Sequence, residues 1–131
     1  MPNRQATILL LEEEPTLAEI TAFRLELLGH RVQAFDNGQA AIDWLAGNSV
    51  DLIAVGHLAD IESIELLNRF SDDQSTSHLP LVYLSANSDL TEVQRAFNAG
   101  ADEYLVTPYD PFVLEQKVEG LLRASAGPGK R

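Results

Sequence analysis

Short apolar runs alternate with longer amphipathic stretches five times along this chain, and no other feature constrains its fold as strongly. Three runs are apolar almost throughout, as strands that are covered by helices on both faces must be. The other two are short or alternate with polar residues, which is typical of strands at the edge of a sheet. The predicted central strands are 6–11, 50–55 and 81–84, and the predicted edge strands are 31–35 and 103–106.

Each predicted strand is followed by a stretch in which apolar residues recur with helical spacing. The first of these helices begins at Pro15, a favourable first helical position, and ends before Gly29. The predicted helices are 15–28, 39–46, 62–70 and 90–99, with a final helix around 114–122. On the first helix, the predicted buried residues are Leu17, Ile20, Thr21, Leu27 and Leu28.

Strand–helix pairs joined by right-handed crossovers form an open, doubly wound parallel sheet with helices on both faces. The predicted fold class is therefore α/β, a five-stranded three-layer sandwich. The 131 residues suffice for one such domain, which we expect to span residues 1–124. Residues 125–131 are rich in Gly, Pro and small residues, so we expect a flexible tail or the start of a linker there.

The charge balance and the absence of cysteine exclude several classes of function. Nine Lys and Arg against 20 Asp and Glu give a net charge of −11, which repels nucleic-acid phosphates and anionic lipid headgroups. Without Cys, the chain has no disulfide, no thiolate nucleophile and no Cys-bound metal. The apolar run near the N-terminus is too short for a signal peptide or a membrane span, so we expect a cytoplasmic protein.

Three consecutive carboxylates, Glu12, Glu13 and Glu14, follow the first predicted strand. Negative charges gathered at one strand end repel one another unless a cation or solvent relieves them. One interpretation is a divalent-metal site. The other is a solvated acidic loop in which Glu14 lies near the positive end of the following helix.

Four segments, ILLLEEEP, DLIAVGHLADIESIELL, LPLVYLSAN and RAFNAGADEYLVTPYD, resemble those of response-regulator receiver domains in their order and spacing. The resemblance covers residues 7–123, and GADEYLVTPYD is its most specific part. It implies the flavodoxin-like strand order 2-1-3-4-5 and a role in two-component, phosphorelay-type signal transduction.

Receiver domains accept a phosphoryl group from a histidine kinase on an Asp after the third strand, and acidic residues after the first strand hold magnesium. The resemblance matches Glu12 and Glu13 to the metal-binding pair, and Ser85 to the hydroxyl that binds the phosphoryl group. It also matches Tyr104 to the aromatic switch residue and Pro108 to a proline that follows a cis peptide bond.

Two departures from the family pattern affect the residues that take part in phosphotransfer. The phosphoacceptor position is Gly56, which has no side chain to form an acyl phosphate. The position of the phosphate-binding Lys is Thr107, which carries no positive charge. The longer arms of Glu12 and Glu13 alter the geometry that octahedral magnesium requires, so we expect weak magnesium binding at most and no other cofactor.

The sequence therefore predicts a degenerate receiver, or pseudo-receiver, that is not an enzyme and works through protein contacts without phosphorylation. The resemblance implies that the contact surface is the face of the fourth helix, fifth strand and fifth helix, the usual output and dimer face of receiver domains. A signalling protein, an effector domain or a second copy of the chain would bind there. Its polar candidates are Arg95, Asn98, Asp102, Glu103, Asp110 and Lys117.

Two alternatives stand beside this prediction. The first is a receiver that is still phosphorylated at a non-standard acceptor, such as Asp60 in the loop beyond Gly56, with His57 as a further candidate. The second is a flavin-binding domain, which is disfavoured because three Glu residues stand where a phosphate-cradling loop is needed.

Overall fold

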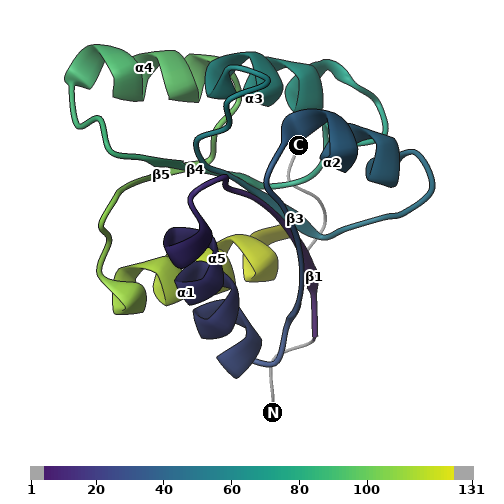
Figure 1. Ribbon diagram of the computed structural model, residues 1–131, viewed down its shortest axis with the longest axis vertical. Coiled ribbons are helices and arrows are strands. Elements are labelled where there is room, and N and C mark those ends of the chain that lie inside the picture. The colour runs from purple at the N-terminus through teal and green to yellow at the C-terminus, as the bar shows by residue number, and fades with distance from the viewer. Residues whose placement is uncertain (1–4, 126–131) are drawn as a thin grey trace.

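The computed structural model describes residues 5–125, in which a five-stranded parallel sheet lies between two layers of helices (Figure 1). The strands are β1 (Thr7–Leu11), β2 (Arg31–Phe35), β3 (Leu52–Val55), β4 (Leu81–Ser85) and β5 (Glu103–Val106). The helices are α1 (Pro15–Leu27), α2 (Gly38–Leu45), α3 (Ser63–Asp72), α4 (Leu90–Asn98) and α5 (Pro111–Ser125). The strand order is β2-β1-β3-β4-β5, which confirms the doubly wound fold and both edge strands. Of the predicted tail, Ser125 is the last residue of α5, and residues 126–131 lie outside the described residues.

The helices divide between the two faces of the sheet. α1 and α5 cover one face, and α2, α3 and α4 cover the other (Figure 1). Successive side chains of a strand point to opposite faces, so each central strand contributes to both layers. In β1, Ile8 and Leu10 pack with α1 and α5, whereas Leu9 and Leu11 pack with α2, α3 and α4. This alternation explains why the central strands are apolar throughout.

The predicted buried side of α1 is wrong in part. Ile20 and Leu27 were expected in the core, but their exposed fractions are 48% and 62%. Thr21 and Leu25 are the buried residues of this helix. Apolar residues surround α1, so their spacing does not single out one face, and packing against the sheet and α5 selects it instead.

Glycines end two of the helices as predicted. Gly29 after α1 and Gly100 after α4 have φ angles of 98° and 116°, a region in which glycine has no steric penalty. Element boundaries otherwise differ from the predicted ones by at most two residues, except that α5 extends three residues beyond the predicted stretch at each end. For example, β3 begins at Leu52, and just before it Asp51 binds the Thr7 backbone through both its N–H and its carboxylate.

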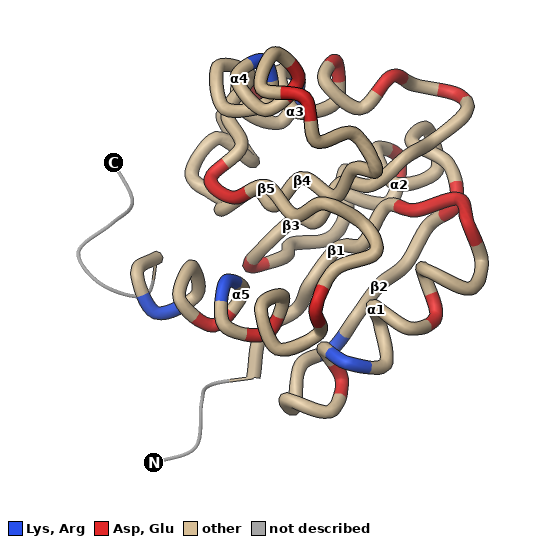
Figure 2. Tube along the Cα trace, turned by 90° about the vertical axis from the view of Figure 1, so that its left-hand side faces the viewer, with Lys and Arg blue, Asp and Glu red and all other residues tan. Residues whose placement is uncertain are grey.

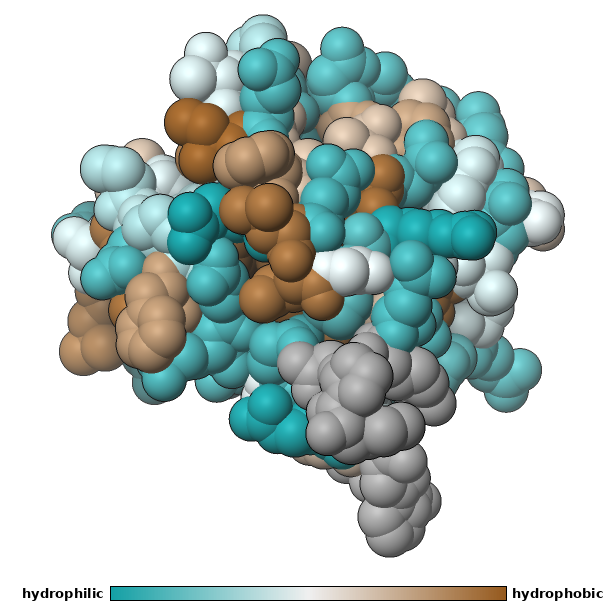
Figure 3. All heavy atoms as spheres, turned by 90° about the horizontal axis from the view of Figure 1, so that it is seen from below, coloured by the Kyte–Doolittle hydropathy of each residue, from teal (hydrophilic) through white to brown (hydrophobic). Residues whose placement is uncertain are grey.

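Acidic residues outnumber basic ones among the charged residues of the chain. Acidic residues lie on loops and helices around the whole trace, and basic residues are few (Figure 2). Figure 3 views the face that carries α1 and α5, where hydrophobic side chains form a strip among hydrophilic ones. Exposed apolar residues of these two helices include Phe23 and Phe112. Within residues 5–125, no helix is both long and apolar enough to cross a membrane.

Candidate functional site

A pocket lies at the carboxyl ends of the strands, where ligands bind in sheets of this type. It is lined by Glu12, Leu17, His57, Ser63, Tyr83, Leu84, Ser85, Ala86, Asn87 and Thr107. The fold thus brings together Glu12, Ser85 and Thr107, which lie far apart in the sequence. Gly56 lies next to Glu12 at the end of β3.

Gly56 is buried and closely surrounded. Its N–H donates to Leu11 O of β1 (2.6 Å), and its carbonyl accepts a hydrogen bond from the Ser63 hydroxyl (2.8 Å). A Cβ atom at position 56 would lie 2.9 Å from Leu11 O and would overlap Glu12 Oε1. A side chain therefore fits at this position only if its surroundings rearrange.

Glu12 points inward over Gly56, and the residue is only 4% exposed. Its Oε2 accepts a hydrogen bond from the Glu14 N–H (3.1 Å). Burial raises the pKa of the Glu12 carboxyl, while hydrogen bonds from the Glu14 and His57 amides act against that rise. The carboxylate therefore occupies the place where a side chain on residue 56 would begin.

The other two carboxylates after β1 point elsewhere. Glu13 lies 3.4 Å from Nε2 of His57, whose side chain is 76% exposed. Glu14 accepts hydrogen bonds from the N–H groups of Thr16 and Leu17 and caps α1, as the acidic-loop interpretation requires. The three carboxylates do not converge. Residues 5–125 contain no group of three or more Asp, Glu or His side chains that could hold a metal ion.

Ser85 and Thr107 lie side by side at the ends of β4 and β5. Thr107 N–H donates to Ser85 O (2.9 Å), and the Ser85 hydroxyl accepts a hydrogen bond from the Asn87 N–H (3.1 Å). The Thr107–Pro108 peptide bond is cis, the isomer expected from the sequence. The residues that line the pocket include no Lys or Arg, so this edge offers hydroxyl groups without a cation.

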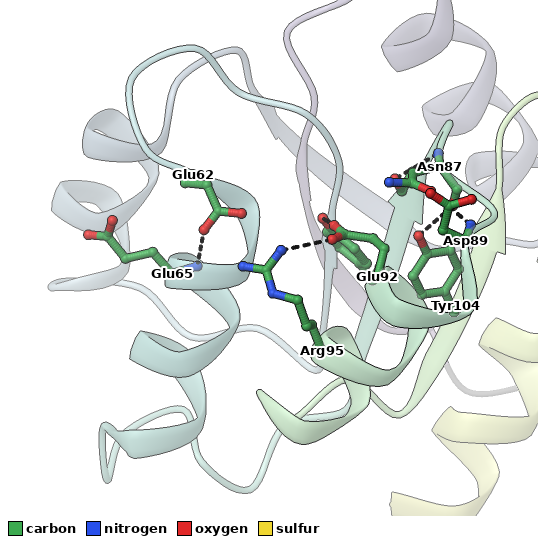
Figure 4. A network of polar contacts seen from close by, with 9 residues as sticks. Glu62, Glu65, Asn87, Asp89, Glu92, Arg95 and Tyr104 are labelled. Carbon is green, nitrogen blue, oxygen red and sulfur yellow. Dashed lines mark hydrogen bonds and ion pairs between the residues drawn. The ribbon is translucent and has the colours of Figure 1, made fainter.

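Two tyrosines connect the sheet to α4 and to the loop before it, and Figure 4 shows Tyr104 pointing toward that loop. Tyr104 OH donates to Asn87 O (2.6 Å), and Tyr83 OH donates to Glu92 Oε2 (2.8 Å). The two rings meet edge to face with their centroids 5.1 Å apart. Arg95 also binds Glu92, at 3.0 Å. In this conformation, Tyr104 is held against the loop that precedes α4.

The Asp60 carboxylate binds the first backbone amides of α2. Its two carboxylate oxygens accept hydrogen bonds from the N–H groups of Gly38 (2.8 Å) and Gln39 (3.0 Å). These bonds lower the pKa of the Asp60 carboxyl. Asp60 is not among the residues that line the pocket, and both its oxygens bind helix amides. The arrangement gives no support to Asp60 as a phosphoacceptor.

Several site residues were missed from the sequence. Ser63 is buried and joins α3 to Gly56, and its only signal was a position at the start of a predicted helix. The hydrogen bond between Tyr83 and Glu92 was also missed, because one pattern predicts a strand residue and the other a helix surface. No local pattern showed that Glu12 turns inward.

The predicted contact face of α4, β5 and α5 carries polar and apolar side chains together. Lys117 Nζ binds Glu103 Oε1 between α5 and β5 (2.8 Å). Exposed apolar residues on these elements are Leu90, Phe97, Val106 and Phe112. The composition suits protein contact, and its use as an interface stays a prediction.

Comparisons with known proteins identify a family whose sequence model matches most of this chain. The sequence model of the response regulator receiver domain matches residues 8–119. The phosphate regulon transcriptional regulatory protein PhoB of Pseudomonas aeruginosa is 30% identical over 124 residues, which cover 94% of this chain and 54% of that protein. The chain spans about half the length of the first curated relatives it matches.

Two solved structures are similar in sequence as well as in fold. One is the signal receiver domain of a signal transduction histidine kinase from Syntrophus aciditrophicus, with a TM-score of 0.86 and 26% identity over 96% of each chain. The other is a two-component response regulator from Clostridium difficile, with a TM-score of 0.84 and 26% identity. That similarity covers 91% of this chain and 97% of the other.

Proposed function

This chain belongs to the response regulator receiver domain family of two-component signalling, and on that premise we propose that it acts as a pseudo-receiver, without accepting a phosphoryl group. The observation that carries the proposal is Gly56 at the acceptor position, with the Glu12 carboxylate in the adjoining space. An acyl phosphate forms when a carboxylate oxygen attacks phosphorus, and glycine has no such oxygen.

The remainder of the pocket supports the same proposal. Thr107 cannot supply the positive charge that pairs with a phosphoryl group, and no Lys or Arg lines the pocket in its place. Magnesium needs near-octahedral oxygen ligands, whereas Glu12 and Glu13 point to different partners. We therefore expect weak magnesium binding at most, no other cofactor and no enzymatic activity.

The signal would pass through protein contacts at the face of α4, β5 and α5. Charged groups such as Glu103 and Lys117 can exchange their mutual ion pair for one with a partner, and exposed Val106 adds apolar area. A signalling protein, an effector domain or a second copy of the chain fits this surface. The net charge of −11 argues against nucleic-acid binding by this domain.

The organisation of the full-length protein is part of the proposal. PhoB of Pseudomonas aeruginosa, a transcriptional regulatory protein, is about twice the length of the matched region. We propose a receiver domain over residues 1–124, followed by a linker, in a cytoplasmic protein that carries an effector domain or recruits one.

Incubation with a small phosphodonor and magnesium, followed by measurement of the intact mass, tests the proposal. We expect the mass to stay unchanged under conditions in which a receiver with the acceptor Asp gains one phosphoryl group. A mass gain would overturn the proposal. If that gain disappears in Asp60→Ala, the alternative acceptor is established instead.

Self-association through the proposed face is tested separately by sedimentation equilibrium. Val106→Asp should dissociate a dimer that forms through α4, β5 and α5. Leu27→Asp is the matched control, because Leu27 is also exposed but lies on α1. Equal effects of the two changes would argue against this face.

A further inference from the structure

We infer that Glu12 replaces the missing side chain at position 56: its carboxylate fills the acceptor space and ties the loop after β1 to the loop after β3. Gly56 and the inward Glu12 then form one coupled feature of the site. The inference rests on the proposed phosphorylation-independent function. It identifies Glu12 as the group that occupies the space beside residue 56.

The steric evidence comes from the three atoms nearest to a Cβ atom built on Gly56. Two of them belong to the Glu12 carboxyl group, namely Oε1, which the Cβ atom would overlap, and Cδ at 3.0 Å. The third is Leu11 O at 2.9 Å, a backbone atom that moves only with its strand. The space at position 56 is therefore controlled mainly by a side chain that can be shortened by substitution.

The hydrogen bonds show how this carboxylate is held. Its Oε2 accepts a hydrogen bond from the Glu14 amide in the loop after β1, and the His57 amide in the loop after β3 also acts to lower the pKa of this carboxyl. The Glu13 N–H also donates to His57 O (3.0 Å), which joins the same two loops. The carboxylate thus lies where these loops meet, a place that a side chain from β3 would otherwise occupy.

The burial of Glu12 separates this role from that of a solvated acidic residue. The residue is 4% exposed, and the ion pairs of residues 5–125 do not include it. Backbone amides of Glu14 and His57, together with the nearby His57 side chain, stabilise its charge, and they act only while both loops keep their positions. Burying a carboxylate costs free energy unless hydrogen bonds offset the cost, and the Glu14 amide supplies one such bond.

This coupling has a direct consequence for restoring the site. Gly56→Asp with Thr107→Lys supplies both missing groups, but the new carboxylate must share its space with Glu12. Adding Glu12→Asp shortens that arm by one methylene group and retains an acidic group for magnesium. We therefore expect the triple variant to have room for the new Asp side chain at position 56 and to bind a phosphoryl mimic. In the double variant, Glu12 should still occupy that space and hinder binding.

The experiment is a titration of both variants with magnesium and beryllofluoride, a non-covalent phosphoryl mimic, followed by amide chemical shifts. We expect the triple variant to bind at least about tenfold more tightly than the double variant, because the shorter arm relieves the steric clash and also suits magnesium. The coupling of Gly56→Ala with Glu12→Asp in unfolding free energy, measured without magnesium, reports the steric part alone. The matched control adds Glu14→Asp to the double variant, which removes the same methylene group from a residue that caps α1. This control should behave like the double variant.

The outcomes separate this inference from the proposed function. Equal affinity of the double and triple variants overturns the inference and leaves the proposal about the wild-type chain standing. Phosphorylation of the wild-type chain overturns the proposed function instead. If neither variant binds, the unfolding free energy of Gly56→Ala with and without Glu12→Asp decides: additive effects overturn the inference, and coupled effects support it.

Discussion

Adding a single methyl group at position 56 measures how tightly the space around this residue is filled. Gly56→Ala places a Cβ atom 2.9 Å from Leu11 O and onto Glu12 Oε1. Within residues 5–125, positive φ angles occur only at Gly29 and Gly100, so alanine at position 56 adds no left-handed backbone strain. The measured cost therefore reports the contacts themselves.

The magnitude follows from three contributions. Overpacking costs about 1–3 kcal/mol, and displacing Glu12 from the Glu14 amide adds about 1 kcal/mol. The lower entropy of alanine in the unfolded chain offsets about 0.4–1 kcal/mol. We expect Gly56→Ala to lower the free energy of unfolding by about 2 kcal/mol, or roughly 6–10 °C in Tm for a chain of this length.

The assay is urea unfolding followed through Trp44 fluorescence, because Trp44 packs against Phe35 with ring centroids 5.8 Å apart. In a Glu12→Asp background, the cost of Gly56→Ala should fall to about 1 kcal/mol or less, because mainly the Leu11 O contact is left. In a Glu14→Asp background it should not change. A cost near zero, or the same cost in both backgrounds, would refute the steric argument.

Three further predictions concern groups around the site. Tyr83→Phe removes the hydroxyl that donates to Glu92 and should lower the free energy of unfolding by about 1.5 kcal/mol. Amide hydrogen exchange in α4 should become faster, and unchanged exchange there would contradict a link between α4 and the sheet. Asp60→Ala should lower Tm at neutral pH, and the difference from wild type should shrink as pH falls through the lowered pKa of the Asp60 carboxyl. The sign follows because a carboxyl with a depressed folded-state pKa stabilises the fold only while it is ionised, so a difference that stays constant into acid would count against the capping role. The His30 ring should carry its proton on Nε2 and donate it to Glu119, because Nδ1 accepts a backbone N–H; ¹⁵N shifts that place the proton on Nδ1 would contradict this geometry.

The fold was largely predictable because its signals are local and repeated. Apolar runs of strand length, helical spacing between them, and glycines at the ends of α1 and α4 each specify one element. The right-handed crossover rule then leaves few ways to assemble five such pairs. The polar residues Arg31 and Gln33 correctly marked β2 as an edge strand, since an edge strand is less covered than a central one.

The buried side of α1 was less predictable, because its local pattern does not distinguish one face from the other. A periodic pattern defines a face only when polar residues occupy the opposite side, and α1 carries Ile20, Phe23 and Leu27 toward solvent. The contact between Thr21 and Tyr109, a residue just before α5, connects positions far apart in the chain. Such a contact leaves no trace in local spacing.

The site shows the same division. Residue type alone establishes that Gly56 has no nucleophile and that Thr107 has no charge, so these two features follow directly from the sequence. The inward direction of Glu12, the capping of α1 by Glu14 and the contact of Asp60 with the start of α2 become visible only in the folded chain. The direction of a carboxylate depends on which amides surround it, and folding brings those amides together from separate loops.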